Sequence, residues 1–224
     1  HFSDEAHEHM VMPKAVYISN PTELGTLYTK AELAALHDVC KAYDVPLYVD
    51  GARLGYGLMS PKADIPLPEL ANLCDMFYIG GTKCGAYIGE ALVINNDRYK
   101  YCYRNLIKQR GGVLAKGRLM GIQFDTLFTD NLYFDICKSA VDQALRIRKA
   151  FEEVGVPIWG TSYTNQQFPI LTSEQLKKFD GKFAYEFWCK LDEERTVVRF
   201  CTVSAACRTP FQPEHRPKRR LSQC

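Results

Sequence analysis

Short apolar runs alternate with a helical pattern near the start of the chain, which predicts a β-α-β unit. Residues Ala15–Ser19 form a β-favouring apolar run that ends at Asn20-Pro21, as expected for a strand followed by a turn. Residues 30–43 repeat apolar side chains at helical intervals, and Leu47–Val49 forms the next strand. This order favours a parallel sheet with helices on its faces.

Two more strands are predicted to complete this sheet. Residues Met76–Ile79 and Ala91–Ile94 are short apolar runs, and Leu67–Cys74 reads as a short helix before them. About a dozen residues, with Gly85 and Gly89 among them, separate the two strands, which is short for a crossover helix. We therefore expect the fourth strand to run antiparallel to the third.

Helical periodicity dominates the middle of the chain and then gives way to a mixed pattern. Residues 97–108 and 114–154 predict helices, with a bend near Asp130-Asn131. Gly155 and the proline that follows shortly after it end this helical stretch. We expect a strand, a helix and a strand beyond it, at Phe168–Leu171, Ser173–Leu191 and Thr196–Cys201.

These patterns predict an α/β fold arranged in four consecutive segments. Residues 1–112 are expected to form a mostly parallel sheet with helices on both faces, and residues 113–154 long connecting helices. Residues 155–202 predict a small α+β domain. Residues 203–224 contain three prolines and a basic cluster, so we expect a disordered tail there.

Composition and charge narrow the classes of function. The chain has 224 residues, of which 46% are hydrophobic, enough for a substantial core. No apolar run approaches the roughly 18 residues that a membrane span needs, so we expect no membrane segment. The net charge of +2 is uneven, because the basic cluster lies in 203–224 and leaves the rest slightly acidic. This distribution argues against nucleic-acid binding.

The cysteines and the first residues bear on the cell compartment. The nine cysteines are scattered and form no C-x-x-C pair, which indicates reduced thiols in the cytoplasm and neither a disulfide framework nor a metal site. Residues His1–Met10 lack the basic and apolar regions of a signal peptide and contain no initiator methionine at the start. We therefore interpret the chain as a fragment.

Asp50 and Lys83 are the strongest candidates for chemistry. Each lies just past an apolar strand and beside small residues, and ligands of open α/β sheets bind at that edge. Glycines on both sides of Lys83 and after Asp50 would let a ligand approach the backbone closely. A lone charged residue in a loop is most often a solvated surface charge, so the pairing of the two is what favours a site.

Three motifs in this order resemble the threonine aldolase branch of the aromatic amino acid β-eliminating lyase/threonine aldolase family. They are Asp-Gly-Ala-Arg at 50–53, Gly-Gly-Thr-Lys at 80–83 and Val-Arg-Phe-Cys-Thr at 198–202. The resemblance covers about residues 9–202. It implies the large domain of a fold-type-I enzyme that depends on pyridoxal phosphate (PLP), in incomplete form, and a lyase that cleaves threonine or allo-threonine to glycine and an aldehyde.

The resemblance also implies roles for individual residues. Lys83 resembles the lysine that binds PLP covalently, and Asp50 resembles the carboxylate paired with the pyridine nitrogen, so both are expected to be catalytic. Thr82 and Arg53 are expected to contact the cofactor as well. Arg53 and Arg199 resemble the two arginines that hold the substrate carboxylate, a task that suits the guanidinium fork.

A further segment bears on assembly. Residues Lys108–Arg118 resemble the family's loop between the two domains, in which Lys108 and Arg110 would reach a neighbouring subunit's site. The resemblance therefore implies a homodimer or homotetramer for the full-length enzyme, acting on a small amino-acid substrate.

The sequence departs from the family at both ends and leaves alternatives open. The family's N-terminal third, which supplies the phosphate-binding loop and a ring-stacking histidine, has no counterpart here. After Cys201-Thr202 the family continues with an amphipathic helix, whereas this chain shows no helical period. A β-eliminating lyase, an aminotransferase and a non-catalytic remnant remain possible. A nucleotide-binding domain is disfavoured because Asn20–Gly25 lacks the glycine fingerprint.

Overall fold

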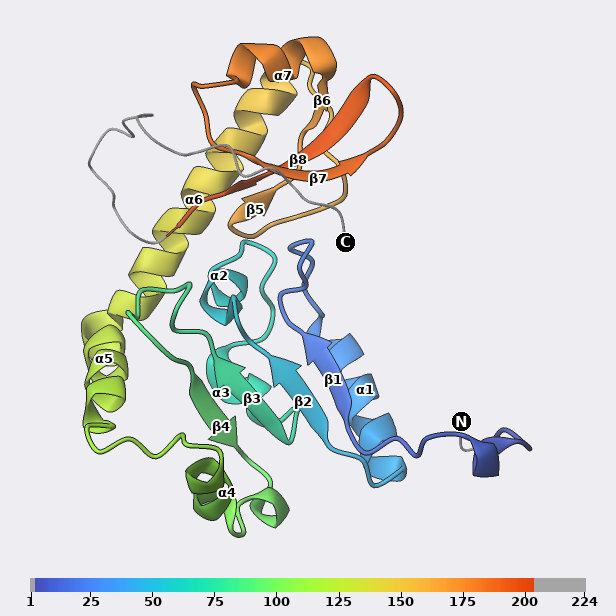
Figure 1. Cartoon of the computed structure of the whole chain (residues 1–224), viewed down its shortest axis with the longest axis vertical. Helices are drawn as coiled ribbons and strands as arrows, with labels where there is room; N and C mark the ends of the chain where they lie inside the picture. The colour runs from blue at the N-terminus through green and yellow to red at the C-terminus, as the bar shows by residue number, and fades with distance from the viewer. Residues whose placement is uncertain (1–2, 204–224) are drawn as a thin grey trace.

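The computed structural model describes residues 3–203 and contains two sheets joined by a long helix (Figure 1). In the first sheet, β1 (Val16–Ser19), β2 (Leu47–Asp50) and β3 (Met76–Ile79) run parallel in that order. The fourth strand, β4 (Ala91–Ile94), pairs antiparallel with β3. The predicted mostly parallel sheet and its antiparallel fourth strand are therefore confirmed.

Local sequence signals account for the helices around this sheet. The first long helix begins where Thr29 and Glu32 form a capping box, each bonding to the other's backbone N–H. The helical elements before and after the sheet strands are η1 (His7–His9), α1 (Lys30–Ala42), α2 (Leu54–Leu58), α3 (Leu67–Leu70), η2 (Asp97–Tyr99), α4 (Tyr103–Gln109), α5 (Arg118–Phe128), η3 (Thr129–Asn131) and α6 (Leu132–Glu153).

The helix predicted over residues 97–108 is interrupted. A short 3-10 turn, η2, comes first, and α4 begins only at Tyr103. The break falls at Cys102, whose backbone is left-handed with φ of 54°. Such a backbone conformation cannot continue a right-handed helix.

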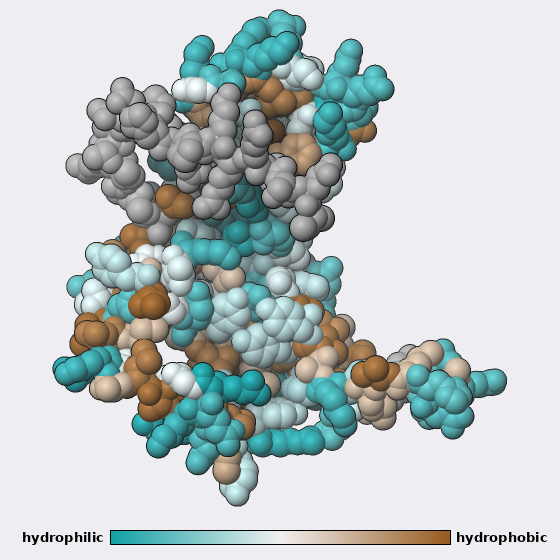
Figure 2. Space-filling view, viewed as in Figure 1, coloured by the Kyte–Doolittle hydropathy of each residue, from teal (hydrophilic) through white to brown (hydrophobic). Residues whose placement is uncertain are grey.

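The two faces of the first sheet differ in burial. Leu47 and Val49 of β2 and Phe77 of β3 are buried on one face, within the main hydrophobic core. Alternation along the strands puts Tyr17 on the opposite face, beside its register partner Tyr48, and Tyr17 is 61% exposed. Figure 2 shows residues of intermediate hydropathy over this part of the sheet. We call this tyrosine-bearing side the open face.

The second sheet is antiparallel and contains two strands that the sequence did not predict, at residues 166–167 and 186–190. Its strands are β5 (Gln166–Gln167), β6 (Ile170–Thr172), β7 (Glu186–Lys190) and β8 (Arg195–Cys201), with β8 paired to the other three. The helix predicted over 173–191 was wrong in its second half, because α7 (Ser173–Phe179) ends early and β7 follows.

A tight turn explains that strand. The Asp192 carboxylate accepts hydrogen bonds from the backbone N–H groups of Glu194 and Arg195, at 3.0 and 2.7 Å. This turn folds the chain into a hairpin, and the ladder to β8 satisfies the backbone of β7. Pairing with a neighbouring strand therefore outweighs the helical preference of the segment.

One helix takes part in both cores. Helix α6 contributes Cys137 and Val141 to the core under the first sheet and Phe151 to a smaller core under the second. The predicted bend lies just before α6, where Asp130 and Asn131 have φ values of 50° and 62°. The domain boundaries proposed from the sequence stay a prediction, and the expected tail, apart from Val203, lies outside the described residues.

Within residues 3–203, no helix combines the length and apolar character needed to cross a membrane. The same residues contain no group of three or more histidine, cysteine, aspartate or glutamate side chains placed to hold a metal ion.

Candidate functional site

Asp50 lies at the carboxyl end of β2, on the open face of the sheet. The Tyr17 hydroxyl donates to its Oδ2 and the Tyr78 hydroxyl donates to its Oδ1. The backbone N–H of Ala52 also donates to Oδ1, at 2.9 Å. The two strands beside β2 therefore aim tyrosine hydroxyls at one carboxylate, because residues paired across a parallel ladder face the same side.

These contacts decide the charge of Asp50. Partial burial alone would raise the pKa of its carboxyl, but the hydrogen bonds from Tyr17, Tyr78 and Ala52, with the nearby charge of Lys83, outweigh it and lower the pKa below its usual value. The hydrogen bond to Asp50 raises the pKa of Tyr17 to about 12. Burial and the same carboxylate raise the pKa of Tyr78. Asp50 is therefore ionised and both tyrosines are neutral donors near neutral pH.

Two glycines let the strand ends approach closely beside Asp50. A Cβ atom at Gly51 would lie 1.9 Å from the carbonyl oxygen of Tyr78, and one at Gly80 would lie 2.4 Å from that of Ala52. The Gly80 N–H donates to the Gly51 carbonyl at 2.9 Å. Only residues without side chains fit this crossing, which brings the turn after β3 next to the end of β2.

Lys83 lies in that turn. Its side chain is exposed, and its carbonyl oxygen accepts a hydrogen bond from the buried Tyr56 hydroxyl. The turn is closed by the N–H of Cys84, which donates to the Gly81 carbonyl at 2.8 Å. The neighbouring Thr82 hydroxyl donates to the Gly89 carbonyl at 3.4 Å. The predicted residues Asp50, Thr82 and Lys83 thus gather at one edge of the sheet.

The two predicted arginines meet on a carboxylate that the sequence analysis did not single out. Arg53 binds Glu23 with both terminal nitrogens, Nη1 to Oε2 at 2.7 Å and Nη2 to Oε1 at 3.3 Å. Arg199 Nη1 donates to the same Oε1 at 2.7 Å and to Gln166 Oε1 at 3.0 Å. Glu23 therefore bridges Arg53, at the start of α2, and Arg199 of β8.

Lys108 and Arg110 do not join this group. They lie at the end of α4 and just after it, and both are exposed. Figure 1 places α4 at the end of the first sheet opposite to the carboxyl ends of β1–β3. Their predicted role at a neighbouring subunit's site stays a prediction.

Four residues of this region were missed from the sequence. Tyr17 and Tyr78 could have been found, because strand alternation puts them on the same face as Asp50. Glu23 also follows the carboxyl end of β1, at the edge where ligands bind. Gln166 gave no local signal, since its amide reaches the Glu23 carbonyl across 143 positions of the sequence.

Comparison with known proteins assigns this chain to a family and a fold. The family model described as Beta-eliminating lyase matches residues 2–174. The chain therefore belongs to the beta-eliminating lyase family, and the α/β fold with a mostly parallel sheet is the fold-type-I architecture predicted from the sequence.

Particular relatives lie within the threonine aldolases. A low specificity L-threonine aldolase of a Pseudomonas species is 26% identical over 205 residues, which are 85% of this chain and 58% of that protein. The same-named protein of Pseudomonas aeruginosa is 26% identical over 72% of this chain and 45% of its own length. A Leishmania major threonine aldolase structure superposes with a TM-score of 0.86 at 44% identity, covering 88% of this chain and 58% of that one.

The coverage is as informative as the similarity. This chain spans only about half of the length of these relatives. Solved structures of lower identity share the fold, among them a putative L-allo-threonine aldolase of Listeria monocytogenes, with a TM-score of 0.63 at 18% identity. The activity of the complete relatives therefore enters only as a proposal for this chain.

Proposed function

We propose that this chain is part of a PLP-dependent lyase that cleaves the Cα–Cβ bond of a β-hydroxy-α-amino acid of the threonine or allo-threonine type, releasing glycine and an aldehyde. The observation that carries the proposal is that Asp50 and Lys83 lie together at the carboxyl edge of the first sheet, while Arg53, just past the same strand end, shares the Glu23 carboxylate with Arg199. Relatives named threonine aldolases support it.

The residues at this edge fit the chemistry of PLP. The pyridine nitrogen needs an ionised carboxylate to stay protonated, and Asp50 is held ionised by its neighbours. A carboxylate has about four lone-pair positions, so the tyrosine bonds leave room for another donor. Lys83 presents an exposed amine near enough for its charge to act on Asp50. When bound, PLP supplies a sink for the electrons left on Cα as the Cα–Cβ bond breaks.

In this proposal the chain's own residues bind and orient the substrate. Arg53 and Arg199 hold its carboxylate, because two guanidinium groups match the geometry and charge of that group. A fixed carboxylate would set the rotation about Cα, and so would select the Cα–Cβ bond as the one to be broken. Asp50 keeps the proton on the pyridine nitrogen, and the Thr82 hydroxyl donates to the cofactor phosphate.

The proposal extends to the location and the oligomeric state of the enzyme. A cytoplasmic homodimer or homotetramer would be the active form, with Lys108 and Arg110 contributing to a neighbouring subunit's site. Both residues are exposed, and Figure 1 places α4 at the end of the first sheet opposite to the carboxyl ends of β1–β3. Their exposure leaves them free to approach another subunit.

Attachment of PLP to Lys83 is the first prediction. In a protein completed with the family's N-terminal third, added PLP should produce a visible absorbance band, and borohydride should fix PLP covalently on the peptide that contains Lys83. Lys83→Ala should abolish both signals, whereas Lys116→Ala, at an exposed lysine of a neighbouring loop, should abolish neither. Labelling of another lysine, with the band retained in Lys83→Ala, would refute the assignment.

Product analysis separates the alternatives. Glycine and an aldehyde from threonine indicate the proposed cleavage, whereas ammonia and a keto acid indicate β-elimination. Transfer of the amino group to a keto acid indicates an aminotransferase. A chain that binds no PLP but associates with a full-length subunit is a non-catalytic remnant.

A further inference from the structure

The Glu23 carboxylate binds Arg53 and Arg199 in the place that an external carboxylate would take. Its two oxygens accept both terminal nitrogens of Arg53, and one of them also accepts Arg199 Nη1. Two-point binding of a carboxylate by a guanidinium group is the strongest common arrangement of this pair. An external carboxylate that binds the same nitrogens must therefore replace this one.

The carboxylate of Glu23 lies on the solvent side of the pair. Its side chain is 53% exposed, whereas those of Arg53 and Arg199 are 14% and 16% exposed. A carboxylate in this position can exchange with water and dissolved anions, because exposed ion pairs are weakly held. The two arginines cannot leave as easily.

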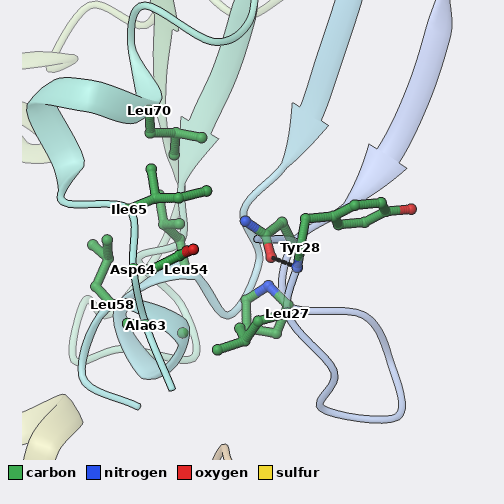
Figure 3. A pocket seen from close by; sticks show the side chains of 11 residues that line it. Leu27, Tyr28, Leu54, Leu58, Ala63, Asp64, Ile65 and Leu70 are labelled. Carbon is green, nitrogen blue, oxygen red and sulfur yellow. Dashed lines mark hydrogen bonds between the residues drawn. The ribbon is translucent and has the colours of Figure 1, made fainter. Parts of the chain in front are cut away.

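The backbone of Glu23 is anchored independently of its carboxylate. Its carbonyl oxygen accepts the Gln166 side-chain amide at 2.8 Å, and Gln166 is fully buried. The loop is closed by the Thr22 N–H, which donates to the Thr26 carbonyl at 2.9 Å. Leu27 and Leu54 then line the same small pocket, as Figure 3 shows. The side chain can therefore swing away while the loop stays in place.

Arg199 keeps other partners when Glu23 leaves. Its opposite edge, Nε and Nη2, donates to Glu186, and its Nη1 also donates to Gln166. Its guanidinium carbon lies 5.4 Å from the centre of the Trp188 ring, within cation–π range. The guanidinium group therefore stays oriented for a second carboxylate.

We infer that Glu23 is an internal competitor for the substrate carboxylate, a specificity-determining residue that sets how strongly the Arg53–Arg199 pair binds an incoming carboxylate. The inference rests on the proposed function only for the identity of that carboxylate as part of an amino acid. The competition itself is a property of the 224-residue chain and does not require PLP.

The test measures access to Arg53 without the cofactor. Phenylglyoxal modifies exposed guanidinium groups, and peptide mass spectrometry gives the rate at Arg53, with and without acetate. Acetate should protect Arg53 in every preparation, and neutral acetamide should not. In Glu23→Gln the modification should be faster, and the half-protecting acetate concentration should fall by about tenfold, as for removal of a competing charge-assisted bond.

Two variants control this result. Glu174→Gln removes an exposed carboxylate that pairs with Lys178 on α7 and bonds to neither arginine, so the acetate concentration that protects Arg53 should stay within about twofold of its original value, far from the effect of a lost charge-assisted bond. Glu23→Asp keeps the charge on a shorter side chain and should lie between the original chain and Glu23→Gln. Circular dichroism spectra that superpose verify that the variants are folded.

Two results would overturn the inference. Equal acetate protection in the original chain and Glu23→Gln would mean that Glu23 does not compete. Weaker protection in Glu23→Gln would mean that Glu23 orients the arginines for binding. Failure of the proposed function would look different, because absent PLP binding or absent glycine release leaves these phenylglyoxal results unchanged.

Discussion

At the scale of single residues, Asp50 depends on neighbours that only a folded sheet can supply. Tyr17 comes from β1 and Tyr78 from β3, on either side of the strand that ends at Asp50. Their hydrogen bonds keep the carboxylate ionised despite partial burial. This is the protonation state that a partner of a pyridine nitrogen needs.

Asp50→Asn tests that role directly. The amide keeps the shape of the side chain, so PLP should still enter, but it cannot hold the proton on the pyridine nitrogen. Turnover of threonine should fall at least about a hundredfold, as for loss of one positioned electrostatic group. The assay belongs on a preparation that releases glycine, formed by this chain alone or completed with an N-terminal segment.

A second substitution tests whether the loss of turnover is specific to the Asp50 carboxylate or follows the loss of any carboxylate. Asp44→Asn changes an exposed carboxylate near the other end of β2, where it pairs with Arg98, and its turnover should stay near normal. An Asp50→Asn enzyme with near-normal turnover would end the assignment of Asp50.

At the scale of secondary-structure elements, the crossing of two strand ends builds the site. Gly51 follows β2 and Gly80 follows β3, and each lies against the other's segment with no space for a side chain. This contact holds the Lys83 turn beside Asp50. The glycines near the site are therefore required by backbone contact as well as by ligand access.

Gly51→Ala should weaken the fold at this crossing. Its methyl group would meet the Tyr78 carbonyl oxygen at 1.9 Å, so the strand ends must separate. We expect the free energy of unfolding to fall by about 1–3 kcal/mol, as for overpacking of a tight contact. Urea denaturation followed by circular dichroism measures the change in midpoint.

Gly121→Ala is the comparison for that experiment. Gly121 lies within α5, and no atom would come within 4 Å of its added Cβ. Alanine should raise stability there by roughly 0.5–1 kcal/mol, because it favours a helix over glycine. Equal midpoints for Gly51→Ala and the original chain would show that the strand ends can separate with no loss in the free energy of unfolding.

At the scale of the whole molecule, two surfaces are left partly uncovered in residues 3–203. One is the open face of the first sheet, where Tyr17 is 61% exposed. The other is an apolar hollow on the smaller core, lined by side chains that include Phe151, Phe179 and Phe200. Exposed apolar surfaces of this kind favour association.

We predict that residues 1–224 alone are not a competent enzyme. The match covers only 58% of the length of the Pseudomonas and Leishmania relatives, and PLP also needs a phosphate cradle and a group stacked on its ring. The isolated chain should associate or aggregate, bind PLP weakly and release no glycine from threonine. Light scattering, PLP titration and a glycine assay test these three statements. A monomer that binds PLP tightly and releases glycine would contradict the prediction.

The sequence by itself determined the elements with local signals. The capping residues Thr29 and Glu32 place the start of α1, and the apolar runs place the four strands of the first sheet. The short connection before β4 determined its antiparallel direction. Asp50 and Lys83 could be paired because the carboxyl ends of neighbouring parallel strands meet at one edge. Each of these inferences uses only residues close in the chain or a rule of sheet geometry.

The tertiary structure alone decided which distant residues complete the candidate site. Glu23 and Arg199 are separated by 176 positions, yet they share a hydrogen bond of 2.7 Å, and no local pattern foretells such a contact. Pairing with β8 likewise turned the predicted second half of a helix into β7. Helical periodicity and capping depend on near neighbours, whereas strand pairing and the meeting of charges depend on how the whole chain packs.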